Sequence, residues 1–176
     1  MEIWVLRHAK AEEGGPGTPD EERALTPGAR ETMRSVAKAI ARLGPNLDAI
    51  LTSPLLRARQ TAEPVARALS LHDDLIESSA LSPEADPKEI LREIEKRRLG
   101  RVLVVGHMPH LGSLVGYLLT GRSNSPIEIK KGALARIEFE GKTPTPPGAL
   151  TLFLTSKALA AREKSWPVAR SASEQS

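Results

Sequence analysis

The sequence contains no cysteine and very few aromatic residues. Without cysteine, the chain cannot form disulfides, use a thiol nucleophile or bind a metal through a thiolate. This composition is compatible with a reducing compartment, and we expect the protein in the cytoplasm. Phenylalanine, tryptophan and tyrosine together make up only 3% of the residues, so the core must consist mainly of leucine, valine, isoleucine and alanine.

Long apolar runs are also missing. No stretch approaches the roughly 18 apolar residues that a membrane-spanning helix needs, so we expect no membrane partner. The N-terminus differs from a signal peptide, because it carries an acid at Glu2 and its apolar run ends at Leu6. The net charge of +3 is spread along the chain. Nucleic-acid binding needs a concentrated basic patch with stacking aromatic side chains, so we expect no nucleic-acid partner.

The length of 176 residues and the hydrophobic content of 40% are typical of one globular domain. We expect that domain over residues 1–160, followed by a flexible polar tail over 161–176. Short apolar runs predict strands at 3–6, 49–51, 102–105, 133–139 and 150–154. Apolar residues at helical spacing predict helices at 29–43, 55–69 and 88–98, and from Pro109 to about 119.

Local signals refine these elements. Thr26 is the expected N-cap of the first helix, with Pro27 at the first helical position, and Gly44-Pro45 should end that helix. Pro64 could break the second helix. The glycines in the segment 14–17 lack the Gly-Lys-Ser/Thr ending of a phosphate-binding loop, so a flexible loop or lid is expected over residues 9–23.

The alternation of strands and helices predicts an α/β fold, a three-layer sandwich with a largely parallel central sheet flanked by helices. Ligands bind beyond the carboxyl ends of the strands in such sheets. Polar residues follow three of the predicted strands at this point: Arg7 and His8, then Ser53 and Arg57, then His107. We therefore expect these side chains to meet at one edge of the sheet.

Two histidines and two arginines in one place favour phosphate chemistry. Arginine binds phosphate oxygens in a bidentate manner and stays charged. A histidine among arginines has a lowered pKa and stays neutral, as a nucleophile must. A second histidine, kept protonated by the negative charge of the bound phosphate, could stabilise the charge on the transferring phosphoryl group. A lone histidine at a strand end is more often structural, and only this combination favours a site.

Three motifs resemble those of the histidine phosphatase superfamily, which has the phosphoglycerate mutase-like fold. Arg7-His8-Ala9 is similar to the Arg-His-Gly signature, residues 53–62 to the second motif, and Val105-Gly106-His107 to the third. The segment 131–135 continues the similarity, which thus covers most of the chain.

The resemblance implies roles for these residues. His8 would accept the phosphoryl group as a phosphohistidine intermediate, which water then hydrolyses. Arg7, Arg57 and His107 would form the phosphate pocket, and Ser53 would support the nucleophile. Neither a metal nor a cofactor is implied.

The short chain is most similar to the SixA-like phosphohistidine phosphatase branch, with matching segments at Lys10-Ala11, 23–26 and 131–133. This implies a partner protein phosphorylated on histidine and a role in signal transduction. The alternatives are a small-molecule phosphomonoesterase on the same scaffold and a non-catalytic module that binds a phosphorylated ligand.

One position departs from the family pattern. Mutase-like members have a glutamate proton donor where this chain has Pro83, in the segment Leu81-Ser82-Pro83. Glu84 and Asp20 are the candidate general acids that could replace it. A protonated phosphohistidine has a better leaving group than an ester, so a weak general acid favours phosphohistidine as substrate. His110 could line the rim of the pocket; with His107 it could bind a metal, but no third ligand is evident and we expect none.

Overall fold

The computed structural model describes residues 1–15, 17–122, 124 and 126–163. Residues 164–176, most of the expected tail, lie outside the described residues. The last described helix, α5 (Ser156–Glu163), continues past the expected domain boundary at residue 160. Within the described part of the chain, no helix is long and apolar enough to cross a membrane.

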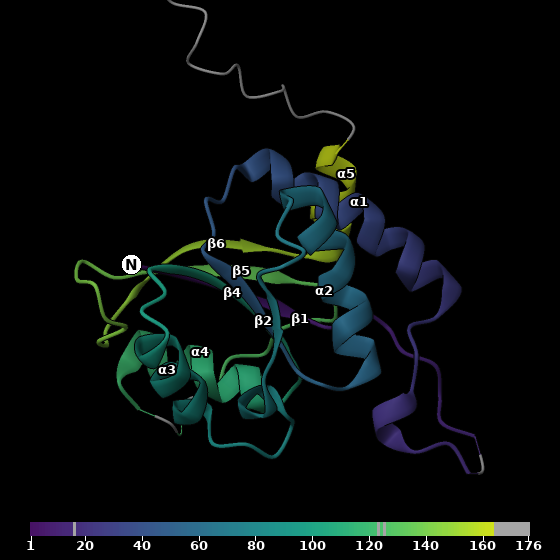
Figure 1. Cartoon of the computed structure of the whole chain (residues 1–176), viewed down its shortest axis with the longest axis horizontal. Helices are drawn as coiled ribbons and strands as arrows, with labels where there is room; N and C mark the ends of the chain where they lie inside the picture. Colours follow the sequence, from purple (N-terminus) through teal and green to yellow (C-terminus); the bar gives the residue numbers. More distant parts are fainter. Residues whose placement is uncertain (16, 123, 125, 164–176) are drawn as a thin grey trace, which may run out of the picture.

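A mixed sheet of six strands lies at the centre, with the order β3-β2-β4-β1-β5-β6 (Figure 1). Parallel pairing joins β3 to β2, β2 to β4 and β4 to β1, whereas β5 and β6 are antiparallel additions at one side. The strands are β1 (Glu2–Arg7), β2 (Ala49–Thr52), β3 (Leu75–Glu77), β4 (Arg101–Gly106), β5 (Leu134–Glu138) and β6 (Ala149–Leu154).

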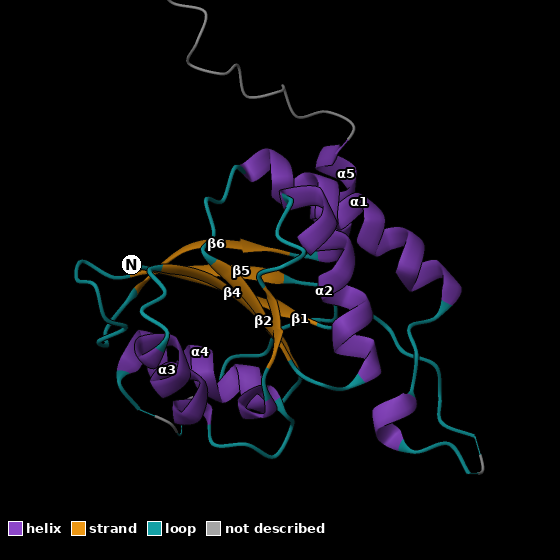
Figure 2. Ribbon diagram, in the orientation of Figure 1, coloured by secondary structure: helices purple, strands orange, loops and turns teal. Residues whose placement is uncertain are grey.

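Helices cover both faces of this sheet, so the expected three-layer α/β sandwich is confirmed (Figure 2). One layer contains α5 and the two long helices α1 (Pro27–Leu43) and α2 (Leu56–Leu69). The other layer contains α3 (Pro87–Lys96) and α4 (His110–Thr120).

Alternating side chains of the strands build two cores, one under each helical layer. In β1, Trp4 and Leu6 pack beneath α1 and α2, whereas Ile3 and Val5 pack on the side of α3 and α4. Successive strand residues point to opposite faces of a sheet, which explains why the run is apolar throughout. Burial on both faces therefore fixes β1 and its carboxyl end in the middle of the molecule.

The capping signals of α1 are confirmed. The Thr26 hydroxyl accepts a hydrogen bond from the Ala29 amide at 3.2 Å, and Pro27 occupies the first helical position. Gly44 ends the helix with a left-handed φ of 65°, a conformation that glycine adopts without steric cost.

Two expectations about the helices and strands need correction. α2 runs without a break through Pro64, because its opposite side, with Ala62, Val65 and Ala66, is buried against the sheet. The short strand β3 and the helix α5 were not predicted. β3 spans only three residues, of which none is fully buried, so it carries no clear apolar pattern.

Gly112 provides a test of the packing between α4 and the segment before β5. A Cβ atom at this position would lie 2.6 Å from the Ile127 carbonyl oxygen and 2.6 Å from Met108 Cε. We expect Gly112→Ala to lower the free energy of unfolding by about 1–3 kcal/mol, the usual cost of overpacking. Urea denaturation would measure this. Gly28→Ala, in the first turn of α1 with no atom within 4 Å, is the control and should not destabilise the protein.

Candidate active site

The carboxyl ends of β1, β2 and β4 bring the sequence-predicted residues together. Parallel pairing of β1 with β4 places Arg7 opposite Gly106, so that His8 and His107 follow at the same level. The His8 amide donates to the Gly106 carbonyl at 3.0 Å, and the two imidazole rings lie 4.9 Å apart. The expectation that these segments meet at one edge is therefore confirmed.

The Ala9 carbonyl fixes the orientation and the tautomer of His8. His8 Nδ1 lies 2.7 Å from the Ala9 oxygen. A carbonyl oxygen can only accept, so Nδ1 carries the proton and Nε2 keeps its lone pair. Nε2 is thus the ring nitrogen with a lone pair available for nucleophilic attack.

Both imidazoles are held in the neutral form. Burial lowers the pKa of His8 to about 4, and the neighbouring cations Arg57, Arg7 and Lys131 act in the same direction. Burial likewise lowers the pKa of His107 to about 3, with further contributions from His8 and Arg57. At neutral pH His8 therefore has the unprotonated nitrogen that nucleophilic attack requires.

Ser53, after β2, holds the second histidine. His107 Nε2 and Ser53 Oγ are 2.8 Å apart, and both residues are buried. Ser53 Oγ also accepts a hydrogen bond from the Leu55 amide at 3.3 Å, just before α2 begins. His107 Nδ1 is buried and has no hydrogen-bond partner among the described residues.

Arg57 lies in the first turn of α2, and its guanidinium contacts the loop between β1 and α1. Its Nη1 donates to the Asp20 carbonyl at 2.6 Å, and its Nη2 contacts the Asp20 carboxylate at 2.8 Å. The Arg57 side chain is only 7% exposed, whereas that of Asp20 is 58% exposed. The Asp20 carboxylate thus partly neutralises the Arg57 guanidinium and competes for it with an anionic ligand.

Arg7 is held in place by the segment between α4 and β5. Its Nη1 donates to the Ile129 carbonyl at 2.7 Å, while its buried Nε has no partner among the described residues. The Gly132 amide donates to the Arg7 carbonyl at 3.0 Å. Gly132 has a φ of 71°, and a Cβ there would lie 2.9 Å from Ser156 Cβ, so the segment before β5 needs glycine at this position.

Thr61 is a supporting residue that the sequence reasoning did not single out. Its hydroxyl donates to the Arg57 carbonyl at 2.7 Å and accepts from the Ala9 amide at 3.2 Å. It therefore ties the strand end that carries His8 to the helix that carries Arg57. The sequence could have indicated this role, because Thr61 lies inside the second motif at residues 53–62 and one helical turn after Arg57.

The two candidate general acids lie in different surroundings. Hydrogen bonds from Arg23 and Arg57 lower the pKa of Asp20, which disfavours it as a proton donor in this arrangement. Glu84 is exposed and forms no side-chain hydrogen bond or ion pair with any other described residue. The assignment of a general acid stays a prediction.

His110, at the first position of α4, is buried rather than at an exposed rim, with 2% of its surface accessible. Burial lowers its pKa, and it lies close enough to His107 to influence the pKa of that residue. Among the described residues, no group of three histidine or acidic side chains is arranged to hold a metal ion. The charges at the site are those of an anion pocket, with arginines around two neutral imidazoles.

Comparison with known proteins gives a consistent result. The family model of the histidine phosphatase superfamily (branch 1) matches residues 3–85. An uncharacterized protein of Picosynechococcus sp. is 32% identical over 138 residues, covering 76% of this chain and 82% of the relative. Phosphohistidine phosphatase SixA of Escherichia coli is 29% identical over 143 residues, covering 80% of this chain and 86% of that protein.

A solved structure has the same fold over nearly its whole length. The protein histidine phosphatase SixA complexed with tungstate superimposes with a TM-score of 0.78 at 25% identity. The match covers 90% of this chain and 99% of the SixA chain.

The lowered histidine pKa values predict how stability depends on pH. An unfolded imidazole titrates near 6.5, whereas folded His8 and His107 titrate near about 4 and about 3. Between these values the unfolded chain binds more protons, so the free energy of unfolding falls as the pH drops below about 6.5. Each such imidazole contributes up to about 1.4 kcal/mol per pH unit.

Urea denaturation between about pH 7.5 and about pH 5.5, about one unit on either side of the free imidazole value, would measure this slope. His107→Gln should make the slope shallower. His72→Gln, which removes an exposed imidazole, is the control and should leave it unchanged. Equal slopes for wild type and His107→Gln would contradict the prediction.

The contact between Asp20 and Arg57 gives a second prediction. Asp20→Asn removes a negative charge next to the pocket, so inorganic phosphate should bind about fivefold more tightly, the effect of about 1 kcal/mol. Isothermal titration calorimetry would measure the affinity. Glu21→Gln, in the same exposed turn, is the matched control. Weaker binding by Asp20→Asn would mean that Asp20 chiefly orients Arg57.

Proposed function

This chain belongs to the histidine phosphatase superfamily, and we propose that it is a metal-independent phosphatase that removes phosphate from phosphohistidine on a partner protein. The observation that carries the proposal is the state of His8. Its Nδ1 proton is held by the Ala9 carbonyl, and its lowered pKa leaves Nε2 unprotonated beside Arg7, Arg57 and His107. That combination provides a nucleophile inside a pocket for an anion.

The reaction proceeds in two displacements. His8 Nε2 attacks the phosphorus, the bond from phosphorus to the substrate imidazole breaks, and that imidazole leaves with a proton. Water then attacks the phosphohistidine on His8, the new phosphorus–nitrogen bond breaks, and inorganic phosphate leaves. The leaving imidazole takes its proton from solvent in the first displacement. In the second, the hydroxyl of the attacking water stays on the phosphate and the other proton of the water returns to solvent, so the protons balance and His8 regains its initial state.

Arg7, Arg57 and His107 supply the charge that this transfer needs. The arginines balance the negative oxygens of the phosphoryl group. A bound dianion raises the proton affinity of His107, so its unpartnered Nδ1 is suited to donate a hydrogen bond to a phosphoryl oxygen. These cations do the work that a metal ion does in other phosphatases.

The surroundings of the candidate acids favour a phosphohistidine substrate over an ester. Pro83 occupies the position of the usual glutamate, Asp20 is engaged by Arg57, and Glu84 is exposed. Once its nitrogen is protonated, a phosphoramidate needs little help from a general acid. The similarity to SixA, named a phosphohistidine phosphatase, and to a SixA structure complexed with the oxyanion tungstate supports the same choice.

A small phosphorylated molecule is the second candidate substrate. The Arg57 side chain is 7% exposed and contacts a loop residue, and His8 is also 7% exposed. An enclosed nucleophile of this kind is easier for a small phosphate monoester to reach than for a side chain on a large protein.

A substrate panel in the presence of a metal chelator tests the proposal. We expect turnover of a protein phosphorylated on histidine at a kcat/KM at least about tenfold above those of p-nitrophenyl phosphate and sugar phosphates, a barrier difference of about 1.4 kcal/mol. A preference for the sugar phosphates would favour the second candidate. Binding without release of inorganic phosphate would indicate a non-catalytic module, and loss of activity with the chelator would exclude metal independence.

Trapping the intermediate tests the nucleophile directly. Rapid quenching with radiolabelled substrate should leave a base-stable, acid-labile phosphate on the wild-type enzyme and none on His8→Ala. We expect His8→Ala to lose at least about a thousandfold in kcat. His72→Ala, on the surface, is the control for loss of a histidine. Full turnover by His8→Ala would refute the assignment.

A further inference from the structure

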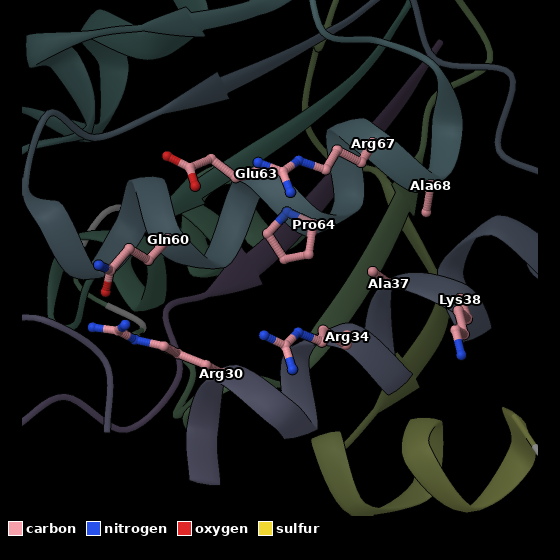
Figure 3. Close-up of a pocket in the computed structure, with 9 residues that line it drawn as sticks. All are labelled: Arg30, Arg34, Ala37, Lys38, Gln60, Glu63, Pro64, Arg67 and Ala68. Carbon is pink, nitrogen blue, oxygen red and sulfur yellow. The ribbon is translucent and has the colours of Figure 1, made fainter. Parts of the chain in front are cut away.

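A groove between α1 and α2 is a charged surface that the chemistry at His8 does not use. It has a volume of about 580 Å³ and lies between the exposed sides of the two helices (Figure 3). We call it the α1–α2 groove, and its lining residues are Arg30, Arg34, Ala37, Lys38, Gln60, Glu63, Pro64, Arg67 and Ala68.

The charge of the α1–α2 groove is mainly positive, since it combines four cationic side chains with the single acid Glu63. Lys38 pairs with Glu163 at 3.3 Å, and Arg30 Nε donates to the Leu25 carbonyl at 3.2 Å. The side chains of Arg34 and Arg67, in contrast, form no ion pair or hydrogen bond with any described residue. Two exposed guanidiniums on facing helices are thus free to bind carboxylates.

The groove begins near the N-terminal end of α2, the helix that carries Arg57. Gln60, at one end of it, lies one helical turn after Arg57 and accepts a hydrogen bond from the Leu25 amide at 2.7 Å. Arg67 lies near the other end, about 15 Å further along α2 than Arg57 at a rise of about 1.5 Å per residue. A chain lying in the groove could therefore present a side chain at His8 while its neighbours contact Arg34 and Arg67.

The arrangement of the cations favours an extended acidic ligand over a small anion. In Figure 3, Arg30 lies near Gln60 at one end, while Arg34 projects from α1 and Arg67 from the facing helix α2. The cations are therefore distributed along the groove and do not converge on one point. Ala37, Pro64 and Ala68 add apolar surface, and no aromatic side chain lines the groove for stacking of bases.

We propose that the α1–α2 groove docks an acidic segment of the phosphorylated partner protein, next to the phosphohistidine that enters the pocket. This inference rests on the proposed function and narrows its substrate to proteins with carboxylates near the phosphorylated histidine. Arginine binds carboxylates in a bidentate manner, and charges at the edge of an interface increase the rate of association.

The structure offers a matched surface for comparison. A hollow along α3, in the opposite helical layer, is lined by Arg92, Glu93, Lys96 and Arg97. There Arg97 is already paired with Glu93 at 2.9 Å. Substituting glutamate for Arg92 and Lys96 changes the net charge of the protein as much as substituting glutamate for Arg34 and Arg67. The change then lies in the opposite helical layer, far from the groove.

Two synthetic phosphohistidine peptides separate docking from chemistry. One carries glutamates and the other serines from about the third to the sixth residue on both sides of the phosphohistidine, positions about 10 to 20 Å from it in an extended chain. For wild type we expect KM about tenfold lower with the acidic peptide, an advantage that increasing salt reduces.

Arg34→Glu/Arg67→Glu should lose this tenfold advantage, with kcat and the turnover of p-nitrophenyl phosphate unchanged. Arg92→Glu/Lys96→Glu should retain it. An equal loss in both variants would show that only bulk charge matters, and reduced turnover of p-nitrophenyl phosphate by the groove variant would show a structural role. Either result would overturn the docking proposal.

A binding measurement without turnover tests the docking proposal independently of the proposed function. If neither peptide is hydrolysed, the proposed function fails, and fluorescence anisotropy with a labelled polyglutamate peptide then tests the groove alone. Binding to wild type that the groove variant loses supports docking, and equal binding to both overturns it. Tighter binding of single-stranded DNA of the same charge would also overturn it, because the occupant would then be a nucleic acid.

Discussion

The parallel pairing of β1 with β4 is the constraint on which the rest of the site depends. Its register places Arg7 opposite Gly106, and the His8 amide continues the ladder to the Gly106 carbonyl at 3.0 Å. Because β1 is buried on both faces, this register cannot slip by one residue without moving its apolar side chains to the wrong core. The two imidazoles are therefore brought within 4.9 Å by backbone hydrogen bonds and apolar packing rather than by any attraction between them.

Electrostatics then decides the state in which those imidazoles exist. Removal from water is the largest cause of the lowered pKa in both, and the surrounding cations add to it. The same cations that keep His8 neutral in the free protein are suited to hold an anion, so one arrangement of charge prepares the nucleophile and attracts its target. Asp20 moderates this charge by pairing with Arg57.

The pocket and the α1–α2 groove place different demands on a substrate. His8 and Arg57 are both almost fully buried, and we propose that the site around them recognises a phosphoryl group whatever molecule carries it. The groove is open and begins one turn of α2 away from Arg57, so it can contact only a ligand large enough to extend beyond the pocket. We thus expect the groove to distinguish a phosphorylated protein from a small phosphate. The residues around His8 would carry out the phosphoryl transfer in either case.

The sequence by itself determined the elements whose signals are local. The cap at Thr26 and Pro27, the apolar runs of β1 and β4 and the polar residues that follow them predicted the sandwich and the edge where His8, Arg57 and His107 meet. The pairing of Asp20 with Arg57 and the facing of Arg34 and Arg67 depended on tertiary structure. These arrangements involve charged side chains from different elements, so the periodicity of apolar residues in the sequence does not predict them. Local propensity is encoded residue by residue, whereas such contacts exist only after the helices pack on the sheet.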